Sequence, residues 1–583
     1  MKPLYDALIK YSDNASAVFH MPGHKLGRGF IPRNAFNDPA RFDVTEIDET
    51  DDLHCPQGPL LEAQALAARA FGAGKTWFLV NGSSCGIFAM IAAICKAGQK
   101  LLIARDFHYS AYNAMRFARV KPVYISVSDG SADMDASIGA VDVKSVEKAL
   151  SDHPDAAALY ITRPGYYGGV CDIAGIARLT RERGVPLLVD EAHGAHLCFS
   201  ERLPAGALEG GADYCVQSAH KTLPAFTQCA YAHVSARSLN ENGARAARFS
   251  EALRVFQTSS PSFILTASLD YAREYMEFYG TARLDMVLDQ CEIFYKKMAE
   301  AGYGIPADIF DYKSTDIGCG IPADILDDLP ADASGVISAD SCNVMPIDAS
   351  QRHCDHPKKR FARDMTRLVI DTSRIGLSGI EADKLLWTRH KIKVEMADPR
   401  HIVMITTVAD SDADFLLLRN ALKQIAAEHK NRAAYEKSVS HRKVDKNDAP
   451  QPISGNLHAE RAGNNLYAAS FEDLTPREAA NDAPKPIADC DRDYVPVCAP
   501  DFISQLHAPR RFLPLNAALG KRAADIVTPY PPGIPLLCPG ELISKSAIDR
   551  INALLDSGSN IKGLKFESGE SDRPDCVFIE IME

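Results

Sequence analysis

Between about residues 75 and 235, short apolar runs alternate with stretches that have the residue spacing of helices. Strands this apolar, separated by helices, are typical of a mostly parallel sheet that is covered on both faces. The predicted strands are 76–80, 100–104, 122–126, 157–161 and 186–189, and the first predicted helices are 86–97 and 110–118. In such α/β sheets, ligands bind beyond the carboxyl ends of the strands. The polar residues that follow strand ends are therefore the first candidates for a site.

A lysine and an aspartate stand at two such strand ends. Asp190 ends an apolar run, and Lys221 lies further along the chain in the segment Ser218-Ala219-His220-Lys221-Thr222. A lysine amine can form a Schiff base with the aldehyde of pyridoxal 5′-phosphate (PLP), and an aspartate can supply the counter-charge for its pyridine nitrogen. A solvated surface lysine and an aspartate that only caps a helix are the alternative interpretations. Together the two residues predict a PLP site in which both are catalytic.

Serines near two strand ends are candidates for binding the cofactor phosphate. Ser83 and Ser84 lie between a predicted strand and a predicted helix, where free backbone N–H groups and the helix dipole favour an anion. Ser218 adds a hydroxyl from the strand end that precedes Lys221. A plain helix N-cap is the alternative for the first two, because it uses the same residue types.

Three histidines lie close to these residues in the sequence. His108 follows the strand 100–104, where an imidazole could stack on the cofactor ring. His193 follows Asp190 closely, and its titration range suits proton transfer or contact with the substrate carboxylate. His220 adjoins Lys221 and could contact phosphate or substrate. We therefore predict all three as cofactor-binding residues, and His193 also as catalytic.

The composition argues against several other classes of function. No apolar run in the 583 residues reaches the length of a membrane helix, and the amino-terminal residues lack the apolar core of a signal peptide. The net charge of −12 argues against nucleic acid as a partner and is compatible with a cationic small-molecule substrate. The 15 cysteines include no Cys-x-x-Cys pair, which favours reduced thiols over disulfides or a zinc site. We expect a cytoplasmic protein without a metal or a membrane contact.

The length predicts several domains rather than one. The small domain is expected to be α+β, with strands at 367–370 and 401–405 and a helix at 379–390 between them. The predicted divisions are an amino-terminal segment that contributes to the active site (1–60), a PLP-binding large domain (61–300), the small domain (301–430) with an irregular insertion (301–365), a linker (431–465) and a carboxy-terminal domain (466–583).

Five segments, in this order along the chain, resemble the signature segments of the bacterial ornithine/lysine/arginine decarboxylases. They are His20-Met21-Pro22-Gly23-His24-Lys25, Asp51-Asp52-Leu53-His54-x-Pro56-x-Gly58, Asp190-Glu191-Ala192-His193-Gly194, Ser218-x-His220-Lys221-Thr222, and a carboxy-terminal set made of 474–478, 529–535 and Pro539-Gly540-Glu541. The resemblance implies an aspartate-aminotransferase-like fold of type I, with a small α+β domain and an extra carboxy-terminal domain. It also implies a homodimer or an assembly of dimers, whose active sites lie at the subunit interface.

The resemblance further implies decarboxylation of a basic amino acid in polyamine biosynthesis. No amino-terminal wing domain of the larger family members precedes the first motif, which indicates the shorter, biosynthetic arginine-decarboxylase-like form. We expect arginine to be converted to agmatine, with lysine to cadaverine and ornithine to putrescine as the next candidates. The predicted substrate contacts are Glu541, Asp52 and His24. The stretch 258–262, which we expect to be helical, is a candidate for contributing to a partner subunit's phosphate site.

Two other functions fit part of this pattern. Another type I PLP enzyme, such as an aminotransferase or an aldolase-type enzyme, would use the same Lys221 and Asp190, and Arg374 could then hold the substrate α-carboxylate. A non-catalytic paralogue that binds polyamines or a partner enzyme is the alternative from a different class. The amino-terminal and carboxy-terminal motifs favour the decarboxylase.

Overall fold

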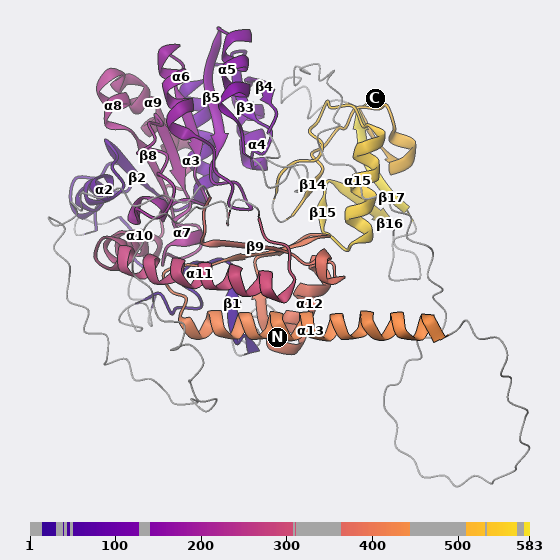
Figure 1. Cartoon of the computed structure of the whole chain (residues 1–583). Coiled ribbons are helices and arrows are strands. Elements are labelled where there is room, and N and C mark those ends of the chain that lie inside the picture. Colours follow the sequence, from indigo (N-terminus) through magenta and orange to yellow (C-terminus); the bar gives the residue numbers. More distant parts are fainter. Residues whose placement is uncertain are drawn as a thin grey trace, which may run out of the picture.

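A computed structural model shows the predicted α/β architecture (Figure 1). It describes residues 14–30, 39, 43–46, 50–127, 140–306, 309, 363–442, 509–530, 533–567 and 576–582. Most of the predicted insertion, most of the predicted linker and the motif at 474–478 lie outside the described residues.

A seven-stranded sheet forms the centre of the large domain, in the order β2-β8-β7-β6-β5-β3-β4. Its strands are β2 (Lys75–Leu79), β3 (Lys100–Ala104), β4 (Lys121–Ile125), β5 (Ala156–Thr162), β6 (Leu187–Asp190), β7 (Tyr214–Gln217) and β8 (Ala230–Val234). β8 pairs antiparallel with both of its neighbours, and the strands from β7 to β4 pair in parallel. The prediction of a mostly parallel sheet is therefore confirmed, and β7 and β8 complete it beyond the five strands listed from the sequence.

Helices cover both faces of this sheet. Buried side chains of α3, α4 and α9 pack on one face, and those of α5 and α6 pack on the other. The helices up to this point in the chain are α2 (Pro59–Ala70), α3 (Gly82–Ile94), α4 (Tyr109–Ala118), α5 (Val143–Asp152), α6 (Ile173–Glu182), the 3-10 helix η3 (Leu197–Phe199), α7 (Ala219–Thr222), α8 (Ala236–Glu241) and α9 (Gly243–Phe256). Because both faces are covered, the strands can be apolar throughout.

A helical region leads from the large domain to the small one. It contains α10 (Phe263–Tyr275), the π-helical turn η4 (Met276–Gly280) and α11 (Thr281–Ala301). The stretch 258–262, which we expected to be helical, instead lies in the connection between α9 and α10. Pro261 explains the difference, because a residue that precedes proline is disfavoured in the α conformation.

The small domain contains a three-stranded antiparallel sheet in the order β11-β12-β9. The described elements of this domain up to β12 are β9 (Arg367–Asp371), the 3-10 helix η9 (Ser373–Ile375), α12 (Gly379–His390), β10 (Ile392–Val394), β11 (Met396–Ala397) and β12 (His401–Ile405). The predicted helix 379–390 is present, and a capping box of Ser378 and Glu381 begins it. β10 pairs in parallel with β1 (Ala17–Phe19), so the amino-terminal segment is anchored to the small domain.

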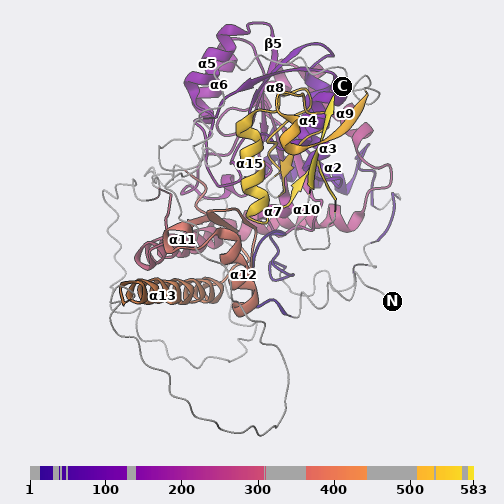
Figure 2. The same cartoon turned by 90° about the vertical axis from the view of Figure 1, so that its right-hand side faces the viewer.

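The long helix α13 (Asp412–Arg442) continues past residue 430 into the segment predicted as a linker (Figure 1). The described residues between 509 and 582 then form a separate unit beside β4 and α4, and its helix α15 faces the viewer in Figure 2. Its elements are β13 (Arg510–Pro514), the 3-10 helix η11 (Leu515–Ala518), β14 (Thr528–Pro529), α15 (Lys545–Asp556), β15 (Ile561–Lys562), β16 (Leu564–Glu567) and β17 (Cys576–Met582). A core of its own holds this unit together. None of the helices described is long and apolar enough to cross a membrane.

Candidate active site

Lys221 lies in the short helix α7, directly beyond the carboxyl end of β7. Its Nζ lies 3.0 Å from Nε2 of His193, in the loop that follows β6. Burial lowers the pKa of Lys221 to about 8, although the charges of Asp190 and Glu395 oppose that shift. With this pKa, roughly a tenth to a fifth of the amine is neutral near physiological pH, a far larger share than in an ordinary lysine, and the neutral amine is the nucleophilic form.

Arg367 determines which nitrogen of His193 carries the proton. Its Nη2 lies 3.0 Å from Nδ1 of His193, and a guanidinium only donates hydrogen bonds. Burial, reinforced by the charges of Lys221 and Arg367, holds the pKa of His193 well below its usual range, so this imidazole is neutral. A neutral imidazole that accepts at Nδ1 carries its proton at Nε2. His193 can therefore donate a hydrogen bond from Nε2 to the amine of Lys221 whenever that amine is neutral.

Asp190 ends β6 and is buried. Its two carboxylate oxygens accept hydrogen bonds from the Tyr160 hydroxyl (3.0 Å) and from the backbone N–H of Ala192 (3.1 Å). Burial raises the pKa of Asp190, while the charge of Lys221 and the two hydrogen bonds lower it. This is a fixed carboxylate near Lys221, in surroundings that favour pairing with a cation.

The predicted phosphate-binding serines meet at the start of α3. Ser218 Oγ donates to Ser83 Oγ at 2.8 Å, which joins the end of β7 to the first turn of α3. Ser84 is exposed in the same turn. Gly82 has a φ of 75°, and a Cβ built on it would meet nothing within 4 Å, so the start of the helix borders open space. Backbone N–H groups, the helix dipole and hydroxyl groups converge there, as an anion requires.

His108 begins α4 and lies against the carboxy-terminal unit. Its Nδ1 accepts a hydrogen bond from the Ser110 backbone N–H (3.2 Å), and the next residue, Tyr109, donates its N–H to the Gly533 carbonyl (3.1 Å). Burial, with the charges of Lys221 and Lys562, lowers the pKa of His108 to about 3. His108 is therefore a neutral ring in a fixed orientation.

The residues at these strand ends fit PLP. They supply an amine with a lowered pKa, a buried carboxylate, a neutral imidazole ring and a converging set of phosphate donors. Arg367 fits as well, because its Nε and Nη1 are buried and have no hydrogen-bond partner among the described residues. A guanidinium placed in this way is suited to an anionic group of a cofactor or substrate.

Four other predicted residues are engaged elsewhere in the protein. Glu541 accepts hydrogen bonds from Arg105 Nη2 at 3.3 Å and from the Cys538 backbone N–H at 2.8 Å. His220 bonds through Nδ1 to the Cys229 carbonyl (2.9 Å). Asp52 accepts from the His54 backbone N–H (2.7 Å), and His24 accepts at Nδ1 from the Gly27 N–H (2.9 Å). None of these bonds joins its residue to Lys221.

Three residues near Lys221 were missed in the sequence. Tyr166 packs its ring edge-on against His193, with the ring centroids 5.0 Å apart, and donates to Glu395 at 2.6 Å. Tyr166 follows the carboxyl end of β5, so the rule that found Asp190 could have found it. Arg367 and Glu395 come from the small domain, where no sequence pattern marks them. Arg374, the arginine proposed there for the aminotransferase alternative, is exposed and lies beside Gly304.

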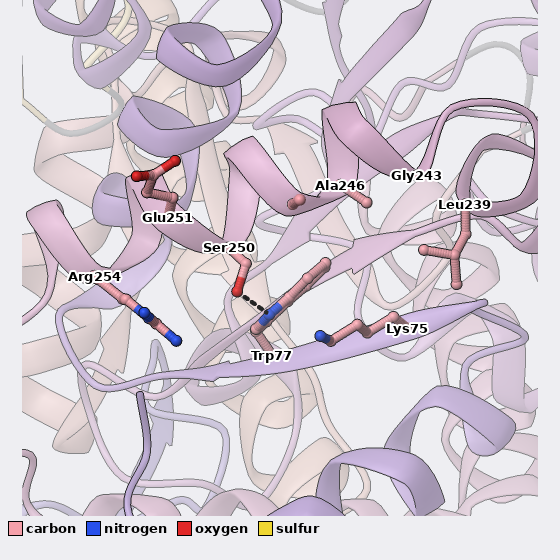
Figure 3. Close-up of a pocket in the computed structure, with 9 residues that line it drawn as sticks. Lys75, Trp77, Leu239, Gly243, Ala246, Ser250, Glu251 and Arg254 are labelled. Atoms are coloured by element: carbon pink, nitrogen blue, oxygen red, sulfur yellow. Dashed lines mark hydrogen bonds between the residues drawn. The ribbon is translucent and has the colours of Figure 1, made fainter. Parts of the chain in front are cut away.

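A groove of about 500 Å³ lies elsewhere, between the edge strand β2 and α9 (Figure 3). Lys75, Trp77 and Arg254 line it, and Trp77 Nε1 donates to Ser250 Oγ at 3.3 Å. None of the predicted site residues lines this groove. The candidate active site is therefore the cluster around Lys221.

The chain matches two models of one protein family. The model described as Orn/Lys/Arg decarboxylase, major domain, matches residues 2–414, and that of the C-terminal domain matches residues 502–568. The chain belongs to the Orn/Lys/Arg decarboxylase family. Members of this family are PLP-dependent carboxy-lyases, so the prediction of a PLP-dependent amino-acid decarboxylase is confirmed, and the aminotransferase and non-catalytic alternatives are not supported.

Curated relatives match either almost the whole chain or about half of it. An arginine decarboxylase of Bacillus subtilis is 30% identical over 573 residues, which cover 96% of this chain and 95% of the relative. One of Halalkalibacterium halodurans is 29% identical, with 96% and 95% covered. A lysine decarboxylase of Pseudomonas aeruginosa is 26% identical, with 51% of this chain and 43% of the relative covered.

Solved structures confirm the predicted type I fold. The lysine decarboxylase of Francisella novicida superposes with a TM-score of 0.64 at 18% sequence identity, covering all of this chain and 81% of that one. The lysine decarboxylase of Pseudomonas aeruginosa superposes with a TM-score of 0.62 at 19% identity, covering 100% and 80%. The predicted homodimer and the domain boundaries stay predictions.

Proposed function

We propose that the chain decarboxylates arginine to agmatine, with PLP bound at Lys221. The observation that carries this proposal is the partly buried amine of Lys221, held by the neutral imidazole of His193 near the carboxylate of Asp190. The similarity to arginine decarboxylases over almost the whole chain supports arginine as the substrate. Lysine and ornithine are the next candidates.

Each residue has a distinct role in this proposal. Lys221 would hold the cofactor through its aldehyde, and Asp190 would balance the positive charge of the pyridine nitrogen. Ser83, Ser84, Ser218 and the start of α3 would bind the phosphate, and His108 would lie against the ring. His193 holds a proton at Nε2 close to Lys221, where it can transfer that proton. When bound, PLP supplies the electron sink that loss of carbon dioxide requires.

The substrate is identified by measuring carbon dioxide release from arginine, lysine and ornithine at equal concentrations with PLP added. We expect the highest kcat/KM for arginine. Faster turnover of lysine or ornithine would replace arginine as the substrate, and the absence of release from all three would overturn the proposal.

The pKa of Lys221 gives a prediction about cofactor uptake. Only the neutral amine attacks the cofactor aldehyde, so the rate at which the apoprotein captures PLP should rise with pH as Lys221 loses its proton. The midpoint is expected near 8, the value to which burial lowers the pKa of Lys221. Stopped-flow measurement of the cofactor band at a series of pH values tests this. A rate that keeps rising towards pH ~10.4, the range of an ordinary lysine, would contradict it.

Gly533 gives a prediction about His108. It has a φ of 83°, and a Cβ built there would lie 3.1 Å from both Cδ2 and Nε2 of the His108 ring. Gly533→Ala should therefore displace His108 and raise the dissociation constant of PLP severalfold, as measured by fluorescence titration. Gly558→Ala is the control, because Gly558 has the same φ but no atom within 4 Å of such a Cβ. Equal PLP affinity in the two variants would rule out this role for Gly533.

A further inference from the structure

Glu395 lies in the small domain between β10 and β11 and is partly buried. Its Oε1 accepts a hydrogen bond from the Tyr166 hydroxyl at 2.6 Å, and its Oε2 accepts from the Met21 backbone N–H at 3.0 Å. One bond therefore comes from the large domain and the other from the amino-terminal segment. Together they fix the orientation of the carboxylate.

A short chain of contacts connects Glu395 to Lys221. The Tyr166 ring that donates to Glu395 packs edge-on against His193, and His193 Nε2 lies 3.0 Å from Lys221 Nζ. In this chain of contacts, the side chains of Tyr166 and His193 separate the Glu395 carboxylate from Lys221. The charge of Glu395 also raises the pKa of Lys221, which agrees with this proximity.

Among the described residues, Glu395 differs from the buried glutamates Glu191 and Glu541 because no lysine or arginine lies within ion-pair distance of it. Glu191 lies 3.5 Å from Arg163, and Glu541 lies 3.3 Å from Arg105. No ion pair joins Glu395 to a lysine or arginine of the described residues. Each of its oxygens accepts one hydrogen bond from the described residues and retains a further lone pair, which is the capacity that a guanidinium fork or an ammonium group needs.

We propose that Glu395 binds the distal cation of the basic amino-acid substrate and that the Tyr166 hydroxyl positions its carboxylate for this contact. The inference rests on the proposed function, because it names the side-chain subsite of the same reaction. Glu541, the carboxylate favoured from the sequence, is held by Arg105 instead. In this assignment Glu395 is the residue that distinguishes a cationic side chain from a neutral one of the same length.

The test compares arginine with citrulline, a neutral analogue of nearly the same shape. Glu395→Gln keeps the shape of the side chain and removes its charge, so we expect the KM for arginine to rise roughly tenfold to a hundredfold, the effect of losing a charge-assisted hydrogen bond. The wild-type protein should bind arginine more tightly than citrulline, and in Glu395→Gln the ratio of these two affinities should fall by the same factor. Tyr166→Phe keeps the ring against His193 and should give a smaller change of the same kind.

Two controls separate this inference from the proposed function. Glu428→Gln changes an exposed glutamate of α13, paired with Arg389, and should leave KM unchanged. The dissociation constant of agmatine for the PLP-loaded protein, measured by calorimetry, tests binding at this subsite without turnover. If the wild type decarboxylates no basic amino acid but binds agmatine in a Glu395-dependent way, the proposed function fails and the subsite stands. Unchanged agmatine affinity and unchanged arginine KM in folded, PLP-loaded Glu395→Gln would overturn the subsite.

Discussion

Lys221→Ala is expected to abolish decarboxylation and to remove the visible absorption band that PLP acquires when bound to a lysine. In the proposed function Lys221 supplies the amine that binds the cofactor, and its pKa of about 8 leaves a far larger share of that amine neutral near physiological pH than in an ordinary lysine. No other described lysine lies within hydrogen-bonding distance of His193. Absorption spectra and carbon dioxide release, measured on the same preparation, test both effects together.

Lys75→Ala is the matched control for this experiment. Lys75 lines the groove between β2 and α9, away from the proposed site (Figure 3). The variant should retain both the cofactor band and the activity. If Lys221→Ala kept the band, another lysine would carry the cofactor and the assignment of Lys221 would be wrong.

The cluster at the strand ends could be predicted because its geometry follows from the sheet. Asp190, Ser218 and Lys221 each lie at or just beyond the carboxyl end of β6 or β7, and parallel neighbouring strands bring such residues together. His108 follows β3 in the same way. Recognising apolar strands was therefore sufficient to place these residues near one another.

The remaining part of the site depends on contacts between distant parts of the chain. Arg367 and His193 are hydrogen-bonded although they are 174 positions apart in the sequence. Glu395 and Tyr166 are hydrogen-bonded across 229 positions. Glu541 was named as a substrate contact from its sequence motif, but the sequence could not show that it pairs with Arg105. Whether a charged residue is free for a substrate depends on its neighbours in space, which a single sequence does not give.

Asp190→Asn is expected to lower kcat by a factor of roughly 10² to 10³ while PLP remains bound, because Lys221 and the phosphate donors are unchanged. The amide has nearly the shape of the carboxylate but cannot hold a positive charge on the pyridine nitrogen, and that charge is what draws electrons from the bond to the departing carboxylate. The KM for arginine should change little, since Asp190 does not face the substrate side chain in this assignment.

Thermal unfolding distinguishes this catalytic role of Asp190 from a structural one. Burial raises the pKa of Asp190, which means that the protein bears a cost for keeping the carboxylate charged in the absence of the cofactor. Replacing it by a neutral amide should therefore leave the Tm of the apoprotein unchanged or higher, although the bond from Tyr160 is altered. A lower Tm with a proportionate loss of activity would indicate that Asp190 mainly supports the fold. If the buried carboxylate of Asp190 serves to pair with the pyridine nitrogen, Asp190→Asn should be stable and have a greatly reduced kcat.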